Sequence, residues 1–176
     1  MRGYTHALIG LTFYVSYLII SDQMRTLASA LMALIFSLLP DIDTPYSTIS
    51  RVTPMTQIVS EKINVALGHR GPLHSLFFRS VITVFLRFMY ASYYISRLSY
   101  IAASLAYLSH LIADSFTPKG VPLFRPIDDR RITICKRRGI RKALCVRTGG
   151  YKEDILGVFI LFTLMILVGI YMGLYP

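Results

Sequence analysis

The amino-acid sequence predicts an all-α, multi-pass membrane helix bundle of about five helices. We expect one integral-membrane domain over residues 1–176. Hydrophobic residues make up 54% of the chain and charged residues only 16%, so it is more apolar than an ordinary soluble domain. Lys and Arg also cluster between the apolar segments, as they do in the loops of membrane proteins.

Five apolar segments are candidates for transmembrane helices. The four that are long or apolar enough to span are Tyr4–Ser21, Pro72–Ser96, Ser99–Phe116 and Ile155–Tyr175. The fifth, Arg25–Leu39, has an apolar core of about a dozen residues, fewer than the roughly 20 that a helix needs to span unaided. We expect it to be short, tilted or re-entrant. The first segment lacks the basic start of a cleaved signal peptide, so we expect the chain to keep its N-terminus.

The distribution of positive charge predicts the orientation. If all five segments span, fifteen Lys and Arg residues fall on the side of the N-terminus, eleven of them in a basic loop at residues 117–152. Only Arg25 and Arg97 fall on the opposite side. The positive-inside rule then places the N-terminus and the basic loop in the cytoplasm. We therefore predict a multi-pass protein of the cell (inner) membrane.

Histidines and acidic residues gather on the predicted cytoplasmic face. The chain has only four His and nine Asp or Glu residues, so their positions can be followed one by one. Those that fall at or near helix ends on this face are His6, Asp41, Asp43, His69, His74, His110, Asp114, Glu153 and Asp154. Histidine and carboxylate together are the ligands of zinc and similar divalent ions.

The spacing of these residues supports a shared site. His110 and Asp114 are four residues apart, which puts both on one face of an α-helix about one turn apart. His69 and His74 lie on either side of Gly71-Pro72. Because proline is favoured in the first turn of a helix, we expect His69 in a loop and His74 in the first helical turn.

Structural alternatives exist for each pair. Asp41 and Asp43 could form a turn and a helix cap. His110 and Asp114 could share a helix-packing hydrogen bond, although a buried aspartate in a membrane helix is costly without a cation or proton partner. Glu153 and Asp154 could serve only to interact with the positive end of the dipole at the start of the last helix.

Five ordered motifs run along the chain from Gly3 to Leu156. They are GYTHALIG, LLPDIDTPYS, HRGPLHS, YLSHLIADSFTPKGVPLFRPI and RTGGYKEDIL. Together they resemble the bacterial and archaeal YdjM-like family, described as LexA-binding, inner-membrane-associated, metal-dependent hydrolases. Each motif alone is weak, but five in order, with their spacing, make a specific match.

The resemblance implies a metal site. The family is more distantly similar to the zinc-dependent phospholipases C and single-strand-specific nucleases, all-helical phosphoesterases whose metals are held by His, Asp and Glu. By that likeness the metal ligands would be His6, Asp41, Asp43, His69, His74, His110, Asp114 and Glu153. The chain has no Trp, so the N-terminal Trp ligand of the soluble phospholipases is missing. The number of ions is left open, from one to three, with Zn²⁺ preferred over Mn²⁺ or Mg²⁺.

We therefore predict a membrane-embedded, phosphoesterase-like hydrolase that cleaves a phosphoester of a lipid or other amphiphile at the cytoplasmic leaflet. A divalent ion makes water nucleophilic at neutral pH, and a pair of ions suits in-line attack on a phosphoester. Asp41 or Asp43 would bridge ions or act as the catalytic base. His69 is a third catalytic candidate, and Arg70 is expected to bind the substrate. Alternatively, His69 and Arg70 together bind the phosphate of the substrate.

The sequence leaves two other classes of function open. One is a non-enzymatic scaffold that holds a structural metal and recruits a cytoplasmic protein partner, such as a repressor, to the basic loop. The other is a divalent-cation transporter, which needs polar residues across the membrane. The outer halves of the helices offer little beyond Arg79, Arg87 and hydroxyl groups.

The basic loop alternates apolar and charged residues around Arg138-Gly139. This pattern is typical of a β-hairpin lying on anionic lipid headgroups, and the alternative is a solvated determinant of topology. Nucleic acid is not expected as a partner, because the loop around this hairpin has no aromatic residue on which bases could stack. Cys135 and Cys145 lack metal-knuckle spacing and would face the reducing cytoplasm, so neither a disulfide nor a zinc knuckle is expected.

Overall fold

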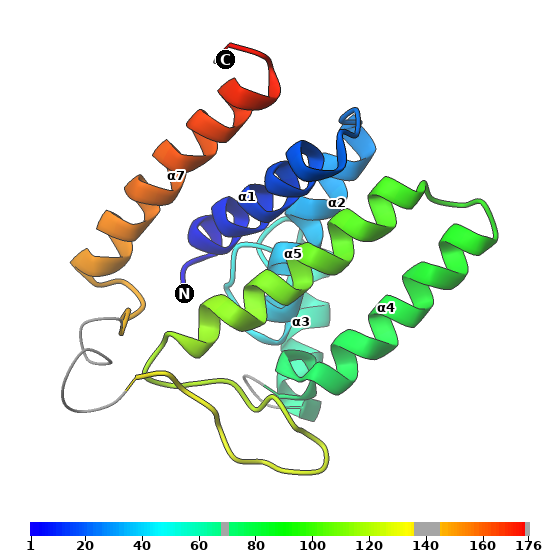
Figure 1. The fold of residues 1–176 in the computed structure, drawn as a ribbon. Coiled ribbons are helices and arrows are strands. Elements are labelled where there is room, and N and C mark those ends of the chain that lie inside the picture. The colour runs from blue at the N-terminus through cyan, green and yellow to red at the C-terminus, as the bar shows by residue number, and fades with distance from the viewer. Residues whose placement is uncertain (68–70, 136–144, 175–176) are drawn as a thin grey trace.

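Helices form the framework of the molecule in the computed structural model, which describes residues 1–67, 71–135 and 145–174 (Figure 1). The predicted all-α class is confirmed. In chain order the helices are α1 (Gly3–Ser21), α2 (Leu27–Leu38), η1 (Leu39–Asp43), α3 (Pro54–Leu67), η2 (Pro72–His74), α4 (Leu76–Ala91), α5 (Arg97–Ser115) and α7 (Tyr151–Tyr171), where η marks a 3₁₀ helix.

Helix α5 is the centre of the bundle. It packs against α1, α2 and α4, while α7 packs against α1 (Figure 1). Ala102, Ala103 and Ala106 of α5 are completely buried. Small side chains let neighbouring helix backbones approach closely, as they do in many membrane bundles. Helix α5 can therefore be enclosed on several sides, and its polar C-terminal turns are enclosed with it.

Gly10 lies where α1 and α2 approach closely. A Cβ atom at this position would lie 2.5 Å from the Cβ of Ser37 and 3.6 Å from that of Ala106. The first distance is far below van der Waals contact, so the crossing requires glycine. Ser37 is buried on α2 just before η1, and this crossing therefore sets where η1 begins relative to α1.

Helix α3 lies in a stretch that the sequence predicts as loop. Its start is capped reciprocally: the amide of Thr56 donates to Thr53 Oγ1 and the amide of Thr53 donates to Thr56 Oγ1. Pro54 then occupies the first turn, where its missing N–H costs nothing. The cap and proline were the available signals. They are missed when segments are sought by length and apolarity alone.

The predicted segment Pro72–Ser96 is divided in the structure. Pro72–His74 forms η2, and α4 begins only after Ser75, whose Oγ accepts from the amide of Phe78. The sequence predicts His74 in the first turn of the long helix. That prediction is wrong, because His74 lies in the separate short helix η2. The break frees the His74 side chain from the direction that α4 would impose.

Two helices in the described residues, α1 and α7, are long and apolar enough to cross a membrane. Helix α7 leaves most of its apolar surface exposed, including Phe159 and Phe162. The 12 residues of α2 and the 16 of α4 reach about 18 and 24 Å at 1.5 Å per residue, short of a ~30 Å hydrocarbon core. The five-pass topology stays a prediction.

The basic loop contains a disulfide that the sequence does not predict. In residues 117–135 and 145–150 the only pairing of strand type is an isolated bridge between Val121 and Ile132. The centre of the predicted hairpin, Arg138-Gly139, lies outside the described residues. Cys135 and Cys145 form a disulfide, so the predicted absence of one is wrong. Backbone bonds from residues 134 and 146 to the end of α5 bring the cysteines together, a tertiary cause that spacing does not reveal.

Gly10→Ala should destabilise the bundle by about 1–3 kcal/mol, because the new methyl group overpacks the α1–α2 crossing. Thermal and denaturant unfolding in detergent would measure it. Ser37→Gly removes the colliding Cβ and alone costs about 0.5 kcal/mol of helix propensity. The double variant should lose less stability than the two single variants together. Strict additivity would contradict the packing explanation.

Candidate metal centre

Side chains from four elements meet at the end of the bundle where the N-terminus lies (Figure 1). Helix α1 supplies a histidine in its first turns, η1 an aspartate, η2 a histidine, and α5 a histidine and an aspartate. We call them the His–Asp cluster: His6, Asp41, His74, His110 and Asp114. Residues up to 108 positions apart in sequence are thus brought together, as the sequence predicts for these five.

The cluster contains two overlapping groups of candidate ligands that share His110. One is His6, Asp41 and His110, and the other is His74, His110 and Asp114; within each group the ligand atoms lie within 4.8 Å of one another. Four of the five side chains are completely buried, and Asp41 keeps 15% of its side chain exposed. The cluster is therefore nearly dry and opens at one carboxylate.

The imidazole of His110 is oriented by α2. Its Nδ1 lies 2.7 Å from the backbone carbonyl oxygen of Ser37. A carbonyl only accepts, so Nδ1 carries the proton and Nε2 has a free lone pair. Nε2 lies 3.4 Å from His74 Nε2 and 3.8 Å from Asp41 Oδ1. Backbone support of this kind is the usual arrangement behind a metal-binding histidine.

His6 provides the test of whether the residues fit a metal. Its ring stacks on His110 with centroids 3.7 Å apart. Both ring nitrogens are buried, and neither makes a hydrogen bond within the described part of the chain; Nε2 lies 3.4 Å from Asp114 Oδ1. A buried nitrogen without such a bond is costly. Imidazole and carboxylate oxygen are also zinc-type donors, so the residues fit a divalent ion.

Asp114 has a cationic neighbour in the cluster. The α-amino group of Met1 donates to Asp114 Oδ1 at 2.7 Å, and both groups are almost fully buried. His74 Nε2 lies 3.9 Å from the other oxygen, Oδ2. The carboxylate thus faces positive or metal-binding partners from several sides, which offsets the cost of burying it.

The two aspartates of the D-x-D motif have different environments. Asp41 Oδ1 lies 3.6 Å from His74 Nε2, whereas Asp43 Oδ2 lies 3.2 Å from His74 Nδ1. Asp43 is completely buried and accepts from the amide of Gly71 at 3.1 Å. It belongs to neither ligand group. Its position behind the imidazole is that of a carboxylate that orients a metal-binding histidine.

The same contacts shift the acidity of the groups in the two 3₁₀ helices. Burial opposes the charge of Asp41, but His110 and a hydrogen bond with His74 hold its pKa below the ordinary range. Burial also opposes a charge on His74, but hydrogen bonds to Asp41 and Asp43 raise its pKa to about 9 in the metal-free protein. A metal would therefore compete with a proton at His74.

Glu153, a predicted ligand, lies apart from the two ligand groups. Its Oε1 accepts from the amide of Arg2 and from Thr5 Oγ1, and its Oε2 accepts from the amide of Gly149. These bonds join the start of α7 to the start of α1. Two predicted residues, His69 and Arg70, lie outside the described residues.

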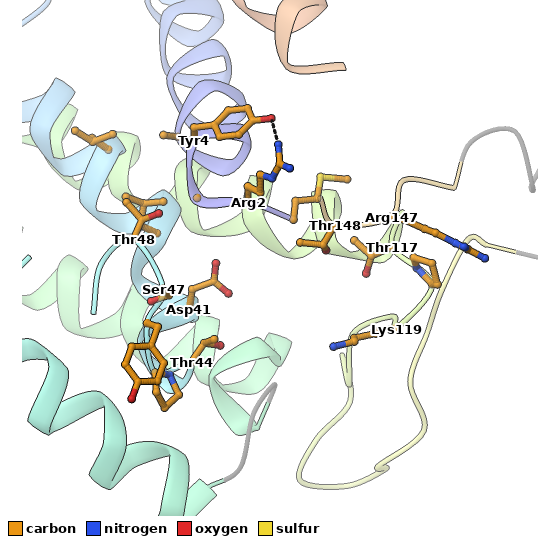
Figure 2. A pocket seen from close by; sticks show the side chains of 18 residues that line it. Arg2, Tyr4, Asp41, Thr44, Ser47, Thr48, Thr117, Lys119, Arg147 and Thr148 are labelled. Atoms are coloured by element: carbon orange, nitrogen blue, oxygen red, sulfur yellow. Dashed lines mark hydrogen bonds between the residues drawn. The ribbon is translucent and has the colours of Figure 1, made fainter. Parts of the chain in front are cut away.

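A pocket of about 970 Å³ reaches the cluster at Asp41 (Figure 2). One wall is apolar, with Ala7, Leu34 and Leu38. The remainder is rich in hydroxyl and basic groups, which come from α1, from the segment after η1 and from the chain that follows α5. These residues are Arg2, Tyr4, Thr44, Tyr46, Ser47, Thr48, Thr117, Lys119, Arg147 and Thr148.

Two supporting residues could not be read from the motifs. The carbonyl of Ser37 leaves no mark in the sequence, because any residue has one. Asn64 donates from Nδ2 to the carbonyl oxygen of Asp43 at 2.7 Å, and it comes from α3. Recognising the cap at Thr53 would have revealed that helix and placed an amide side chain near the D-x-D motif.

The fold and site define a class of protein: an all-helical membrane protein with a buried His–Asp cluster able to hold a metal. A family model described as "YdjM inner membrane protein" matches residues 1–175, and the chain belongs to that family. The resemblance found from the motifs is thereby confirmed.

Individual relatives are similar over different lengths. The inner membrane protein YdjM of Escherichia coli (strain K12) is 38% identical over 96 residues, which are 53% of this chain and 47% of that protein. The YdjM protein of Shigella flexneri matches equally. The chain thus spans about half the length of these two relatives. The uncharacterized protein YvsG of Bacillus subtilis (strain 168) is 29% identical over 162 residues, 88% of this chain and 86% of that one. No solved structure matches the chain.

Glu153→Gln should leave the metal content unchanged and lower stability by about 1–3 kcal/mol, because an amide nitrogen would face a partly buried N–H group that now donates to Glu153. Metal content by mass spectrometry and melting temperature would be measured together. Asp154→Asn is the matched control, since Asp154 is 54% exposed. A variant that folds normally but loses metal would make Glu153 a ligand.

Proposed function

We propose that the protein is a membrane-embedded, metal-dependent hydrolase that cleaves a phosphoester of a lipid or other amphiphile at the cytoplasmic leaflet. The observation that carries the proposal is the contact between the His–Asp cluster and the pocket at Asp41. A buried ligand set with one open edge is what a catalytic metal site needs, whereas a purely structural site is closed.

His6, Asp41, His74, His110 and Asp114 would hold the metal. Zn²⁺ is the best candidate for these donors, with Mn²⁺ and Mg²⁺ as alternatives. Two ligand groups that share one histidine favour more than one ion. A divalent ion held here would supply Lewis-acid chemistry for phosphoester hydrolysis.

The protein's own groups have distinct roles in this proposal. The Ser37 carbonyl keeps the proton of His110 on Nδ1, and Asp43 holds the ring of His74 from behind. Asp41 is the group that meets the substrate, because it belongs to both the cluster and the pocket. Asp43 is then a positioning residue, and Asp41 takes the predicted role of base or bridging ligand. His69 and Arg70 stay candidates for substrate binding on the sequence alone.

The amphiphilic substrate follows from the two kinds of pocket wall. Ala7, Leu34 and Leu38 offer an apolar surface beside hydroxyl and basic groups. Membership of an inner-membrane family and two membrane-length helices support a pocket close to the bilayer, where amphiphiles are concentrated. The excess of Lys and Arg on the side of the cluster favours the cytoplasmic leaflet.

A structural metal is the second candidate function. The observation in its favour is that His6, His74, His110 and Asp114 are completely buried. In that case the metal holds the helix ends together, and the basic loop recruits a cytoplasmic protein partner.

Asp114→Asn and Asp41→Asn should leave the protein folded while hydrolysis falls by orders of magnitude, because each removes an anionic donor. Metal content, melting temperature and turnover of a panel of phosphomonoesters and phosphodiesters would be measured on the same samples. Asp22→Asn at the far end of α1 is the control, since Asn tolerates the left-handed conformation there. Unfolding that follows metal loss, with no hydrolysis by the parent protein, would favour the structural metal.

Asp129→Cys, in a background with Cys135 and Cys145 replaced by Ser, should be protected from membrane-impermeant thiol reagents in intact cells. A cysteine appended after Pro176 should react. The side chain of Asp129 is 75% exposed, so protection would reflect the membrane and not burial. The reverse labelling pattern would overturn the cytoplasmic orientation.

A further inference from the structure

Lys119 lies on the wall of the pocket that faces Asp41. Figure 2 shows its side chain extending from the chain after α5 toward the side of the pocket where the Asp41 carboxylate lies. Lys119 is exposed, so its ammonium group is accessible from the pocket. The site already described contains no role for this residue.

The backbone that carries Lys119 is held firmly against the end of α5. Thr117 donates from Oγ1 to the carbonyl of Asp114, and the amide of Gly120 donates to the carbonyl of Thr117. Gly120 has φ +62°, and a Cβ there would lie 2.6 Å from the carbonyl oxygen of Ile132. Glycine is therefore required at this position. The turn holds the backbone of Lys119 close to the end of α5, which carries the candidate ligand Asp114.

The other two basic side chains of the pocket are engaged or directed elsewhere. Arg2 donates to the carboxylate of Asp154 at 2.5 Å and to the hydroxyl of Tyr4 at 3.3 Å. Arg147 extends away from Asp41 in Figure 2. Lys119 has no ion pair among residues 1–67, 71–135 and 145–174. An ammonium group without an ion pair, opposite an aspartate that would hold a divalent ion, is suited to an anion that lies between the ammonium group and that ion.

The remainder of the pocket limits the shape of that anion. Leu34 and Leu38 of α2 form an apolar wall, and Thr48 supplies a hydroxyl group that can donate to oxygen. An anionic head with an apolar tail meets complementary groups in both parts. A small inorganic anion would leave the apolar wall uncovered.

We propose that Lys119 binds the phosphate group of an amphiphilic ligand whose apolar chain lies along Leu34 and Leu38. This rests on the proposed function and names the residue that selects its substrate. The ligand chemistry is a phosphate or phosphonate oxyanion carrying an alkyl chain. A free phosphate ion shares the head but not the chain, so the two sources can be separated experimentally.

The test uses binding of hexadecylphosphonate, which cannot be hydrolysed at its carbon–phosphorus bond, to the full-length protein in neutral detergent, with and without Zn²⁺. Lys119→Ala should weaken binding about tenfold, as expected for loss of one charge-assisted hydrogen bond. Lys119→Glu should weaken it further, and Lys119→Arg should restore most of it. Binding of hexadecanol should not change in any variant.

Arg131→Ala is the matched control, because Arg131 is an exposed cation of the same loop that does not line the pocket. It should bind hexadecylphosphonate like the parent. Equal losses in Arg131→Ala and Lys119→Ala, or no loss in either, would overturn the assignment. Methylphosphonate binding as tightly as hexadecylphosphonate would overturn the amphiphilic ligand. Binding that depends on Lys119, without hydrolysis of any phosphoester, would support this inference. It would count only against the proposed hydrolase function.

Discussion

The structure depends on burying three imidazoles and two carboxylates together at one end of an apolar helix bundle. Groups of this kind are expensive to remove from water unless they meet one another or a cation. Four of the five are completely buried. Their mutual contacts, the amino group of Met1 and the backbone around them lower that cost. The site therefore has to be formed by several elements at once, and the ends of those elements are fixed by it.

Helix packing supplies the precision that such a site needs. Gly10 lets α1 approach α2 at Ser37, and the carbonyl of the same Ser37 orients His110 on α5. The contact between Gly10 and Ser37 thus positions α1 and α2 against each other, and it also fixes the carbonyl that sets the tautomer of His110 on α5. The 3₁₀ helices η1 and η2 complete the arrangement, since their short turns present Asp41, Asp43 and His74 without the directional constraint of a long α-helix. Rigid support of the ligands is what distinguishes a metal site from a chance group of polar residues.

The sequence predicts the long apolar helices and the cluster because both depend on composition. Long apolar runs mark α1, α5 and α7, and four histidines in 176 residues are rare enough that their placement at helix ends is informative. The sequence does not distinguish ligands from supporting residues. Asp43 and Glu153 are acids like the others, and only their tertiary neighbours, His74 and the amides of Arg2 and Gly149, separate them. The disulfide has the same origin, since the end of α5 brings its two cysteines together.

The depth of the cluster relative to the membrane follows from α1 and α7. Glu153 joins the starts of these two membrane-length helices, and His6 lies in the second turn of α1. The 21 residues of α7 measure about 31 Å, which matches a hydrocarbon core of ~30 Å. If α7 fills that core, the cluster and its pocket lie where the apolar region ends. This holds for either orientation of the chain. This depth supports the lipid substrate of the proposed function, because the phosphate of a lipid headgroup there would lie near a metal held at Asp41 while its chains stayed beside α2.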